Sequence, residues 1–248
     1  MKRLVFCFDG TWNRLDAAHP TNVVLTAQSV APLDRDGTTQ AVFYDEGVGT
    51  GRFETLRGGA FGRGLVRNLE DGYRFLVFNY EPGDEIYVFG FSRGAYTARS
   101  FVGLLATVGV LIRHEAKDIG TSIEAYKQLD RQRVSPGYAE QLRAERSPLV
   151  VVNEEDRAWR IQNGYAEAAS LPLLNIAYLG VWDTVGSLGI PSSLTFSPLF
   201  NKRHRFHDTS LSAMVARARH AVAIDERRTT FEPTLWDNID DLNSRTTL

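Results

Sequence analysis

The stretch from residue 86 to residue 99 combines a serine with the kind of turn that a nucleophile needs. An apolar, β-branched run leads into Gly90, Ser92 and Gly94, and helix-compatible residues follow. A Gly-x-Ser-x-Gly pentapeptide between a strand and a helix is typical of a nucleophile elbow, in which the serine is exposed at the tip of a sharp turn. The glycines let strand and helix pass closely without Cβ clashes. We therefore expect Ser92 to be a nucleophile.

A serine hydroxyl is a weak nucleophile at neutral pH, so it needs a base, and the base needs an orienting carboxylate. Hydrolases with this elbow place them along the chain in the order Ser, then Asp or Glu, then His. Asp183 directly follows the apolar run 175–182, so its side chain is expected at the same sheet edge as Ser92. Asp183 is thus the candidate acid. A structural role, in which it caps the following turn, stays open.

The candidate base comes from the histidines downstream of the serine. His114 precedes the acid, which is the wrong order, and His204 and His207 stand in a basic loop that we expect to be exposed. His220 remains as the candidate. We expect it on a helix over about residues 210–224, which is an unusual place because a triad base normally sits on a loop.

An acyl-transfer site also needs donors for the oxyanion. The residue after the nucleophile, Arg93, supplies one N–H in this type of site, and a loop after a neighbouring strand supplies another. Gly10 and Thr11 follow the first apolar run and are the candidates for that second donor. We interpret Asp9, beside them, as a hydrogen-bond acceptor that organises this loop.

Alternating strands and helices indicate how these residues are positioned. Apolar runs predict strands over 3–8, 41–44, 86–91 and 175–182, each ending in a polar or glycine-containing loop. Apolar residues at steps of three and four predict a helix over about 64–80, and further helices are expected over residues 23–30, capped by Asn22, and after the elbow. These elements predict one α/β domain over residues 1–248, with a doubly wound, mostly parallel sheet.

The stretch 115–170 is charged and helix-prone, and it is too long to be a structureless loop between two core strands. We interpret it as an inserted helical cap. Together with the glycine-rich loop 47–64, it is expected to admit an acyl chain and to contact a membrane surface. Gly47, Gly49 and Gly51 do not form a dinucleotide fingerprint, because the position that the third glycine would take is Arg52.

Composition excludes several classes of function. Lys plus Arg number 28 and Asp plus Glu 30, a formal charge of −2, so a nucleic-acid partner is not expected. Cys7 is the single cysteine, and no His, Cys or Asp cluster has ligand spacing, so neither a metal nor an organic cofactor is expected.

The N-terminal apolar run meets Asp9 at once and differs from a signal peptide. No run approaches the roughly 20 residues of a membrane span, so we expect a cytoplasmic protein in the producing cell.

Five motifs follow one another along nearly the whole chain. They are Phe-Asp-Gly-Thr-Trp-Asn at 8–13, Tyr-Asp-Glu-Gly-Val-Gly-Thr at 44–50, Gly-Phe-Ser-Arg-Gly-Ala-Tyr at 90–96, Gly-Val-Trp-Asp-Thr-Val-Gly at 180–186 and His-Ala-Val-Ala-Ile-Asp-Glu at 220–226. Together they resemble the type VI secretion phospholipase effector-like family, whose domain is of α/β-hydrolase type. The resemblance implies a serine esterase that acts on phospholipids, with Ser92 as nucleophile and Asp183 as acid. It also implies a partner in the secretion apparatus or an immunity protein, and delivery to a target cell.

Two alternatives stay open. Members of the family usually continue to a further strand that ends in a histidine-containing loop, and this chain stops at Leu248, so a truncated, catalytically impaired domain that binds a lipid or protein partner is the first. The second is a phosphatase of the haloacid-dehalogenase type, which Asp9 in Phe-Asp-Gly-Thr superficially matches. That chemistry needs an aspartate nucleophile at the position of Cys7, which counts against it.

Overall fold

The computed structural model of the 248-residue chain describes residues 1–10, 13, 15–16, 18–47, 58–130, 137–184, 210–225 and 234–240. Three features of the sequence lie outside the described residues: Thr11, the glycines at 49 and 51, and the loop that carries His204 and His207.

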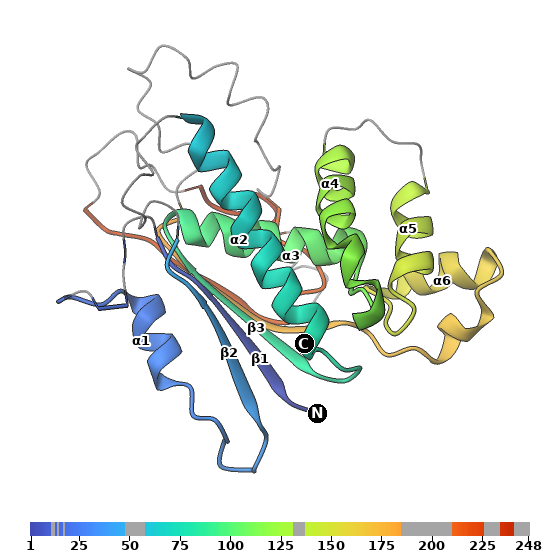
Figure 1. Cartoon of the computed structure of the whole chain (residues 1–248), viewed down its shortest axis with the longest axis horizontal. Coiled ribbons are helices and arrows are strands. Elements are labelled where there is room, and N and C mark those ends of the chain that lie inside the picture. Colours follow the sequence, from blue (N-terminus) through green and yellow to red (C-terminus); the bar gives the residue numbers. More distant parts are fainter. Residues whose placement is uncertain are drawn as a thin grey trace.

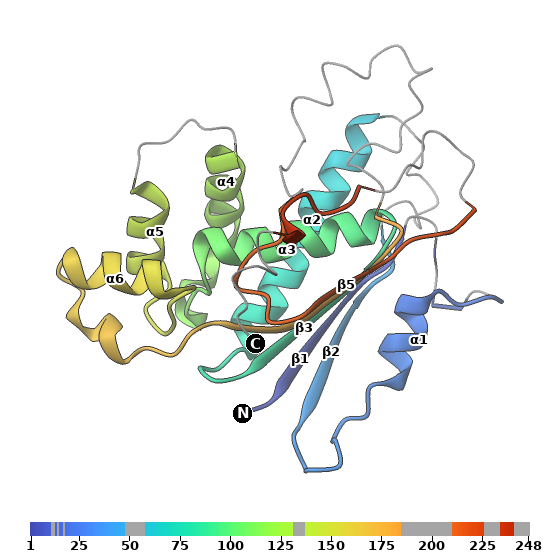
Figure 2. The same ribbon diagram turned by 180° about the vertical axis from the view of Figure 1, so that it is seen from behind.

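The described residues form a five-stranded sheet with helices on both faces (Figures 1 and 2). All neighbouring strands are parallel, and their order is β2-β1-β3-β4-β5. The predicted α/β class with a parallel sheet is therefore confirmed. The strands are β1 (Arg3–Phe8), β2 (Gln40–Asp45), β3 (Glu85–Phe91), β4 (Asn175–Trp182) and β5 (Ala218–Ala221).

The interior strand β1 is apolar after Arg3 because both of its faces are covered. Phe6 and Phe8 face the larger core cluster under α2 (Gly58–Asn79) and α3 (Arg93–Val108). Val5 and Cys7 belong to the smaller cluster under α1 (Asn22–Ser29), on the opposite face. Such a run is expected for a parallel strand that is buried on both sides.

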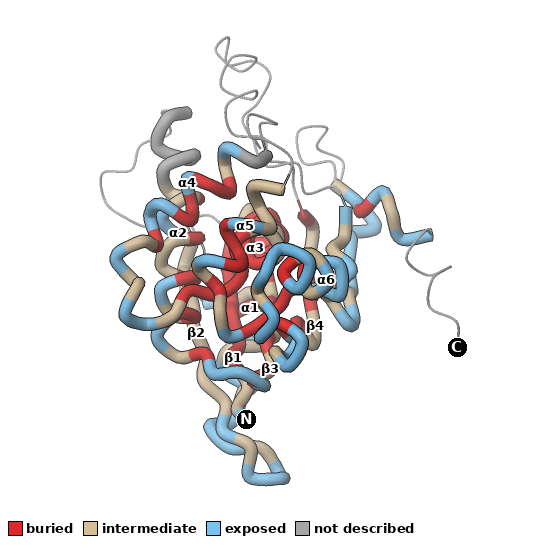
Figure 3. The backbone as a smooth tube through the Cα atoms, turned by 90° about the vertical axis from the view of Figure 1, so that its right-hand side faces the viewer, coloured by how far each residue is buried: buried red, intermediate tan, exposed pale blue. Residues whose placement is uncertain are grey.

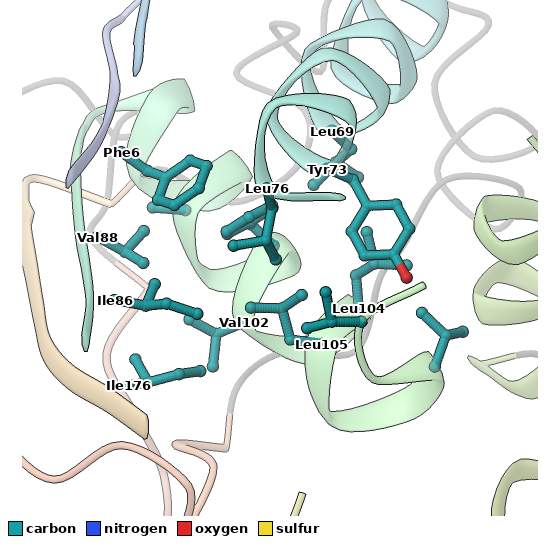
Figure 4. Packing of buried hydrophobic residues seen from close by; sticks show 14 of the residues in the cluster. Phe6, Leu69, Tyr73, Leu76, Ile86, Val88, Val102, Leu104, Leu105 and Ile176 are labelled. Atoms are coloured by element: carbon teal, nitrogen blue, oxygen red, sulfur yellow. The ribbon is translucent and has the colours of Figure 1, made fainter. Parts of the chain in front are cut away.

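The larger core is built where α2 and α3 pack on the sheet (Figure 4). Leu65, Leu69, Tyr73 and Leu76 of α2 are buried, as their spacing predicted. Aromatic rings from strands and helices meet beneath them, and Phe6 lies 4.7 Å from the α3 residue Phe101 between ring centroids. This packing fixes α3 along the sheet, and α3 is the helix that begins directly after Ser92.

The start of α1 differs from the prediction. Thr21, not Asn22, is the N-cap, since its Oγ1 accepts the Val24 N–H at 3.2 Å. Asn22 is already the first helical residue. The Thr21 hydroxyl also donates to Asp9 Oδ2 at 2.8 Å. The position of the cap therefore depends on a contact with the residue after β1 as well as on the N–H groups of the helix.

The segment around His220 is also different from the prediction. The helix expected over about 210–224 is wrong for these residues, because Ala218–Ala221 form the strand β5 and pair with Leu179–Trp182. Ala and Arg favour helices, but exposure alternates from residue 218 to residue 221 with the period of two that a strand requires. Pairing with β4 outweighs the local helix propensity.

The residues between α3 and β4 form a helical insertion. In Figure 3 it lies in front of the buried α3, and in Figure 1 it lies beside the C-terminal end of that helix. A helix of 16 residues is ~24 Å long, so the insertion is about one helix length from Ser92. Its elements are η1 (Arg113–Asp118), α4 (Ile119–Asp130), α5 (Tyr138–Arg146), α6 (Glu154–Gln162) and η2 (Ala166–Ser170).

A buried ion network attaches this insertion to α3. Asp156 is paired with Arg143 Nε at 2.9 Å and with Arg160 Nη2 at 3.0 Å, and all three side chains are buried. Arg143 Nη1 also donates to the carbonyl oxygens of Ala106 and Thr107 in the last turn of α3. Positive charge at this end of a helix is favourable because it opposes the helix dipole.

Among the described residues, no single helix has both the length and the apolar character to cross a membrane. One pair of helical segments, Arg93–Val108 and Arg113–Gln128, is long and apolar enough when the two are taken together, but the chain bends by 115° between them.

Replacing Asp156 with asparagine is expected to destabilise the protein by about 3 kcal/mol, because it leaves two buried guanidinium groups without their carboxylate. Urea unfolding followed by circular dichroism measures the change. Glu155→Gln is the matched control, since Glu155 is an exposed acid in the same helical turn and its loss is expected to cost little. Equal stabilities of the two variants would contradict the role given to the buried network.

Candidate active site

Ser92 lies in the turn between β3 and α3 with φ 54° and ψ −117°, a backbone conformation that residues other than glycine rarely adopt. Its N–H donates to the carbonyl oxygen of Trp182 on the neighbouring strand β4, at 2.8 Å. Holding such a conformation costs about 1–3 kcal/mol, so the surrounding structure must compensate. The residue is partly exposed, and the turn has the strand, sharp bend and helix that the sequence predicted.

Gly90 and Gly94 are required because backbones meet at this turn. A Cβ on Gly90 would lie 2.5 Å from the Gly94 carbonyl oxygen, and a Cβ on Gly94 would lie 2.1 Å from the carbonyl oxygen of Phe8. Both obstacles are backbone atoms that cannot turn away. The first glycine thus lets α3 fold back on β3, and the second lets α3 start against the end of β1.

Arg93 is the first residue of α3, directly after the candidate nucleophile. The N–H groups in the first turn of a helix have no partner within the helix, and they carry the positive end of its dipole. The Arg93 backbone therefore lies beside Ser92 at the positive end of α3. Burial of the side chain lowers the pKa of its guanidinium to about 10, which still leaves it positively charged at neutral pH.

Gly10 and Asp9 form the end of β1 beside this turn. Asp9 is buried, and its Oδ1 accepts the Gly10 N–H at 2.7 Å, so this N–H is engaged within the loop. Its Oδ2 accepts from the Thr21 hydroxyl at 2.8 Å and from the Tyr44 hydroxyl at 2.9 Å. Asp9 thus ties β1 to α1 and β2, as the loop-organising interpretation predicted.

Asp183 lies at the same sheet edge as Ser92. Phe91 and Trp182 are register partners on β3 and β4, so Ser92 and Asp183 each follow the last residue of adjacent strands. The Asp183 backbone has a positive φ of 43°, and its N–H donates to the Ala221 carbonyl oxygen of β5. Its Oδ1 accepts the Ala223 N–H at 2.5 Å. The carboxylate is therefore oriented by the chain that follows β5.

His220 lies on β5 opposite Val181, two strands away from the elbow strand. Its ring is half-buried, and Nε2 accepts the Thr184 N–H at 3.3 Å, a long hydrogen bond. Burial lowers the pKa of His220, and the positive charge of Arg99 lowers it further, whereas Asp183 acts in the opposite direction. The ring is thus biased toward its neutral form, which is the form a base needs.

The structure brings these candidates to one edge of the sheet but does not join their side chains. Among the described residues, no hydrogen bond links the side chains of Ser92, Asp183 and His220. Asp183 is hydrogen-bonded to backbone at the end of β5, and His220 is hydrogen-bonded to backbone at the end of β4. Within the same described residues, no group of three or more His, Cys, Asp or Glu side chains is arranged to hold a metal ion.

Asp45 is a residue near the site that the sequence did not single out. It ends β2, and burial together with the neighbouring carboxylates of Asp71, Glu46 and Asp9 raises its pKa to about 6. Its Oδ2 is buried with no hydrogen-bond partner among the described residues. The chain turns at Gly47, two residues later, where φ is 77° and a Cβ would lie 2.7 Å from the Asp9 carbonyl oxygen. Its place directly after a predicted strand was the feature of the sequence that could have identified it as a residue near the site.

Two other residues of this region were missed. Arg99, two helical turns after Ser92, is buried on α3, and Trp236 packs over its guanidinium at 5.4 Å. The position of Arg99 in a predicted buried helix was a signal for an unusual arginine. Nothing in the sequence near Trp236 indicated that it would contact a strand residue such as His220.

A scan against protein-family models matches residues 2–247 to the T6SS phospholipase effector Tle1-like family, in the part described as its catalytic domain. The chain belongs to this family. An uncharacterized protein of Saccharomyces cerevisiae is 26% identical over 93% of the chain, and the chain spans 32% of the length of that relative. A comparison with solved structures finds no match. The family that the motifs resembled is thus confirmed.

For this Tle1-like chain, Gly94→Ala is expected to destabilise the fold by about 2 kcal/mol, because the added Cβ would meet the backbone of β1. Gly120→Ala is the control. A Cβ at Gly120, in α4, has nothing within 4 Å, so this variant should be neutral or slightly more stable. Chemical unfolding compares the two. A Gly94 variant as stable as the Gly120 variant would show that the close approach to β1 is not required.

Asp45→Asn is expected to stabilise the Tle1-like chain at pH 7.5 by about 1–3 kcal/mol and to have little effect at pH 4. The folded-state pKa of about 6 is above the ordinary 3.8, so the folded chain binds the proton more tightly and loses stability as the pH rises from about 4 through 6. Urea unfolding at several pH values measures this. Asp36→Asn, at an exposed position, should leave the pH dependence unchanged, and a flat wild-type profile would contradict the prediction.

Proposed function

We propose that this chain is a serine esterase of the phospholipase type, which hydrolyses carboxylic ester bonds of phospholipids with Ser92 as the nucleophile. The observation that carries the proposal is the backbone of Ser92, which is held in a rare conformation between two glycines that admit no side chain. An ordinary strand-to-helix connection needs neither the strain nor the close approach. Membership of a family of phospholipase effectors supports the lipid substrate.

The proposed reaction is acyl transfer through a covalent intermediate. The Ser92 hydroxyl attacks the ester carbonyl carbon while His220 takes its proton, and the tetrahedral intermediate then expels the alcohol, which receives that proton. Water attacks the acyl-enzyme in the second half, and the carboxylic acid is released. Asp183 stabilises the imidazolium. None of these steps uses a metal or an organic cofactor.

His220 can serve as this base only if its hydrogen bonds rearrange. In the structure Nε2 accepts the Thr184 N–H, and at 3.3 Å this bond is long enough to be exchanged at small cost. Asp183 can keep the Ala223 N–H at Oδ1, but one of its carboxylate oxygens must also come within reach of the ring. Hydrogen bonds within catalytic groups often tighten only when substrate is bound, so their absence before binding is compatible with the role.

Two backbone groups are proposed to hold the oxyanion. The Arg93 N–H is one of them, because it lies at the start of α3, directly after Ser92, at the positive end of the helix dipole. The Gly10 N–H would have to leave Asp9 Oδ1. Thr11, outside the described residues, remains the other proposed donor.

The partners are proposals as well. We propose that the substrate is a phospholipid met at a membrane surface, and that a secretion apparatus and an immunity protein bind the chain, because the family is described as T6SS phospholipase effector Tle1-like. The relative is about three times as long as this chain, so the activity and partners of a complete protein of that kind are not transferred.

Ser92→Ala is expected to lower the hydrolysis of p-nitrophenyl butyrate and of a phosphatidylcholine vesicle by about 10⁴-fold or more, because the nucleophile is lost. Release of p-nitrophenol and of fatty acid measures the two rates. Ser100→Ala is a matched control, since Ser100 lies on the same helix and is fully buried. A Ser92→Ala enzyme with undiminished turnover would eliminate the serine mechanism.

His220→Ala and Asp183→Asn test the other two assignments in the same assays. A loss of about 10³-fold or more in each is expected if they form the triad. A small effect of His220→Ala would exclude that histidine as the base, while leaving Ser92 as the nucleophile.

A second function is favoured by one observation, the absence of hydrogen bonds among the three candidate side chains in the described residues. The chain would then bind a phospholipid surface without turnover. Sedimentation with phosphatidylcholine and phosphatidylglycerol vesicles separates the two functions. Binding that survives Ser92→Ala, together with wild-type hydrolysis no faster than the blank, would support this second function.

A further inference from the structure

A closed ring of contacts lies behind the candidate site, and we call it the Trp236 clamp. It consists of Arg99, Thr184, His220, Thr234 and Trp236, which come from α3, the end of β4, β5 and the segment 234–240. In Figure 2 the dark red segment 234–240 lies against α3. No motif of the sequence joins these residues, so only the tertiary structure shows the clamp.

Hydrogen bonds that each involve a backbone group form one half of the clamp. Arg99 Nη1 donates to the Thr234 carbonyl oxygen at 2.5 Å, and the Thr234 N–H donates to the Thr184 carbonyl oxygen at 2.7 Å. The Thr184 N–H in turn donates to His220 Nε2. The segment 234–240 is thereby connected to the residue after Asp183 and, through it, to the ring of His220.

Ring contacts form the other half. The Arg99 guanidinium lies over the face of the Trp236 indole at 5.4 Å, and the edge of the His220 ring meets the same indole at 5.4 Å between centroids. Trp236 is 8% exposed and Arg99 is 3% exposed. The indole therefore covers the cation and the imidazole together, and it excludes water from the side of His220 that faces α3.

The segment 234–240 is attached independently of the clamp. Asn238 exchanges two hydrogen bonds with the backbone of Leu211, at 2.7 and 2.9 Å, and Asp237 accepts from the Ser210 hydroxyl. Changing a clamp residue should thus loosen the contact with His220 without detaching the whole segment. This makes the clamp testable by substitution.

We infer that Arg99 and Trp236 are positioning residues for His220, which hold its ring against the end of β4 and keep it in the uncharged form that accepts a proton. This inference rests on the proposed function for the role of His220 in catalysis. Neither residue is placed at the reacting atoms.

The charges around His220 agree with this role. Arg99 on α3 lowers the pKa of the ring, in the same direction as burial, and Asp183 at the end of β4 raises it. The charged neighbours on the other two elements, Arg219 on β5 and Asp237 beside Trp236, are exposed. Loss of the Arg99 charge should therefore raise the pKa of His220, and so should loss of the indole that keeps water away.

The test measures the ring directly in the full chain, by NMR titration of the His220 side chain. Arg99→Met and Trp236→Ala are each expected to move its titration to higher pH. Arg99→Lys keeps the charge and Trp236→Phe keeps an aromatic cover, so both should stay near the wild type. Arg217→Met is the control, because it removes an exposed arginine just before β5 that has no place in the clamp.

The pH profile of ester hydrolysis gives the second readout. In Arg99→Met the acidic limb of kcat/KM is expected to move to higher pH by the same amount as the NMR titration, so that kcat/KM falls at pH 6 and changes little at pH 8. A merely structural residue would lower kcat/KM at both pH values and leave the profile unshifted.

The outcomes separate the inference from the function on which it rests. A His220 titration that stays at the wild-type position in both folded Arg99→Met and folded Trp236→Ala overturns the clamp. A titration that moves while the pH profile does not supports the clamp and removes His220 as the base. If Arg99→Met fails to fold, Trp236→Ala alone decides, because the hydrogen bonds of Asn238 still hold its segment.

Discussion

The close contact of α3 with the ends of β1 and β3 determines the geometry of the turn that carries Ser92. Gly94 touches the backbone of β1, and Gly90 touches the backbone of α3. With both contacts in place, Ser92 has no room for a relaxed conformation and is held at φ 54° by its hydrogen bond to Trp182. The favourable packing of the core cluster under α3 offsets this strain.

The two ends of α3 have different tasks. Its N-terminus presents Arg93 beside the serine, with the positive end of the helix dipole at the site. Its C-terminus is fixed by Arg143, which caps the last carbonyl groups and is itself paired with Asp156. The helical insertion therefore supports the helix from the end opposite to the candidate site, and Arg99 of the Trp236 clamp lies between the two ends.

The sequence predicted correctly those elements whose structure depends mainly on residues that are neighbours in the chain. Alternating and continuous apolar runs identified β1 to β4, and the glycine spacing identified the elbow, because a strand buried on both faces and a turn without room for Cβ leave few residue choices. The predicted N-cap of α1, Asn22, was wrong, because the cap is Thr21, whose hydroxyl has a second partner in Asp9. The helix predicted around His220 was also wrong, because pairing of β5 with β4 outweighs the helix propensity of an Ala- and Arg-rich segment.

The α/β class, the family and the place of Ser92 at a strand-to-helix turn could all be predicted from the sequence. Apolar periodicity, glycine positions and motifs are local properties of the chain, so they can be recognised without the fold. Only the tertiary structure decided which groups surround the candidate base. His220 meets Thr184, Arg99 and Trp236 through strand register and through a segment that follows it by more than a dozen residues. Such contacts depend on how separate elements pack against each other, and that packing leaves no local pattern in the sequence.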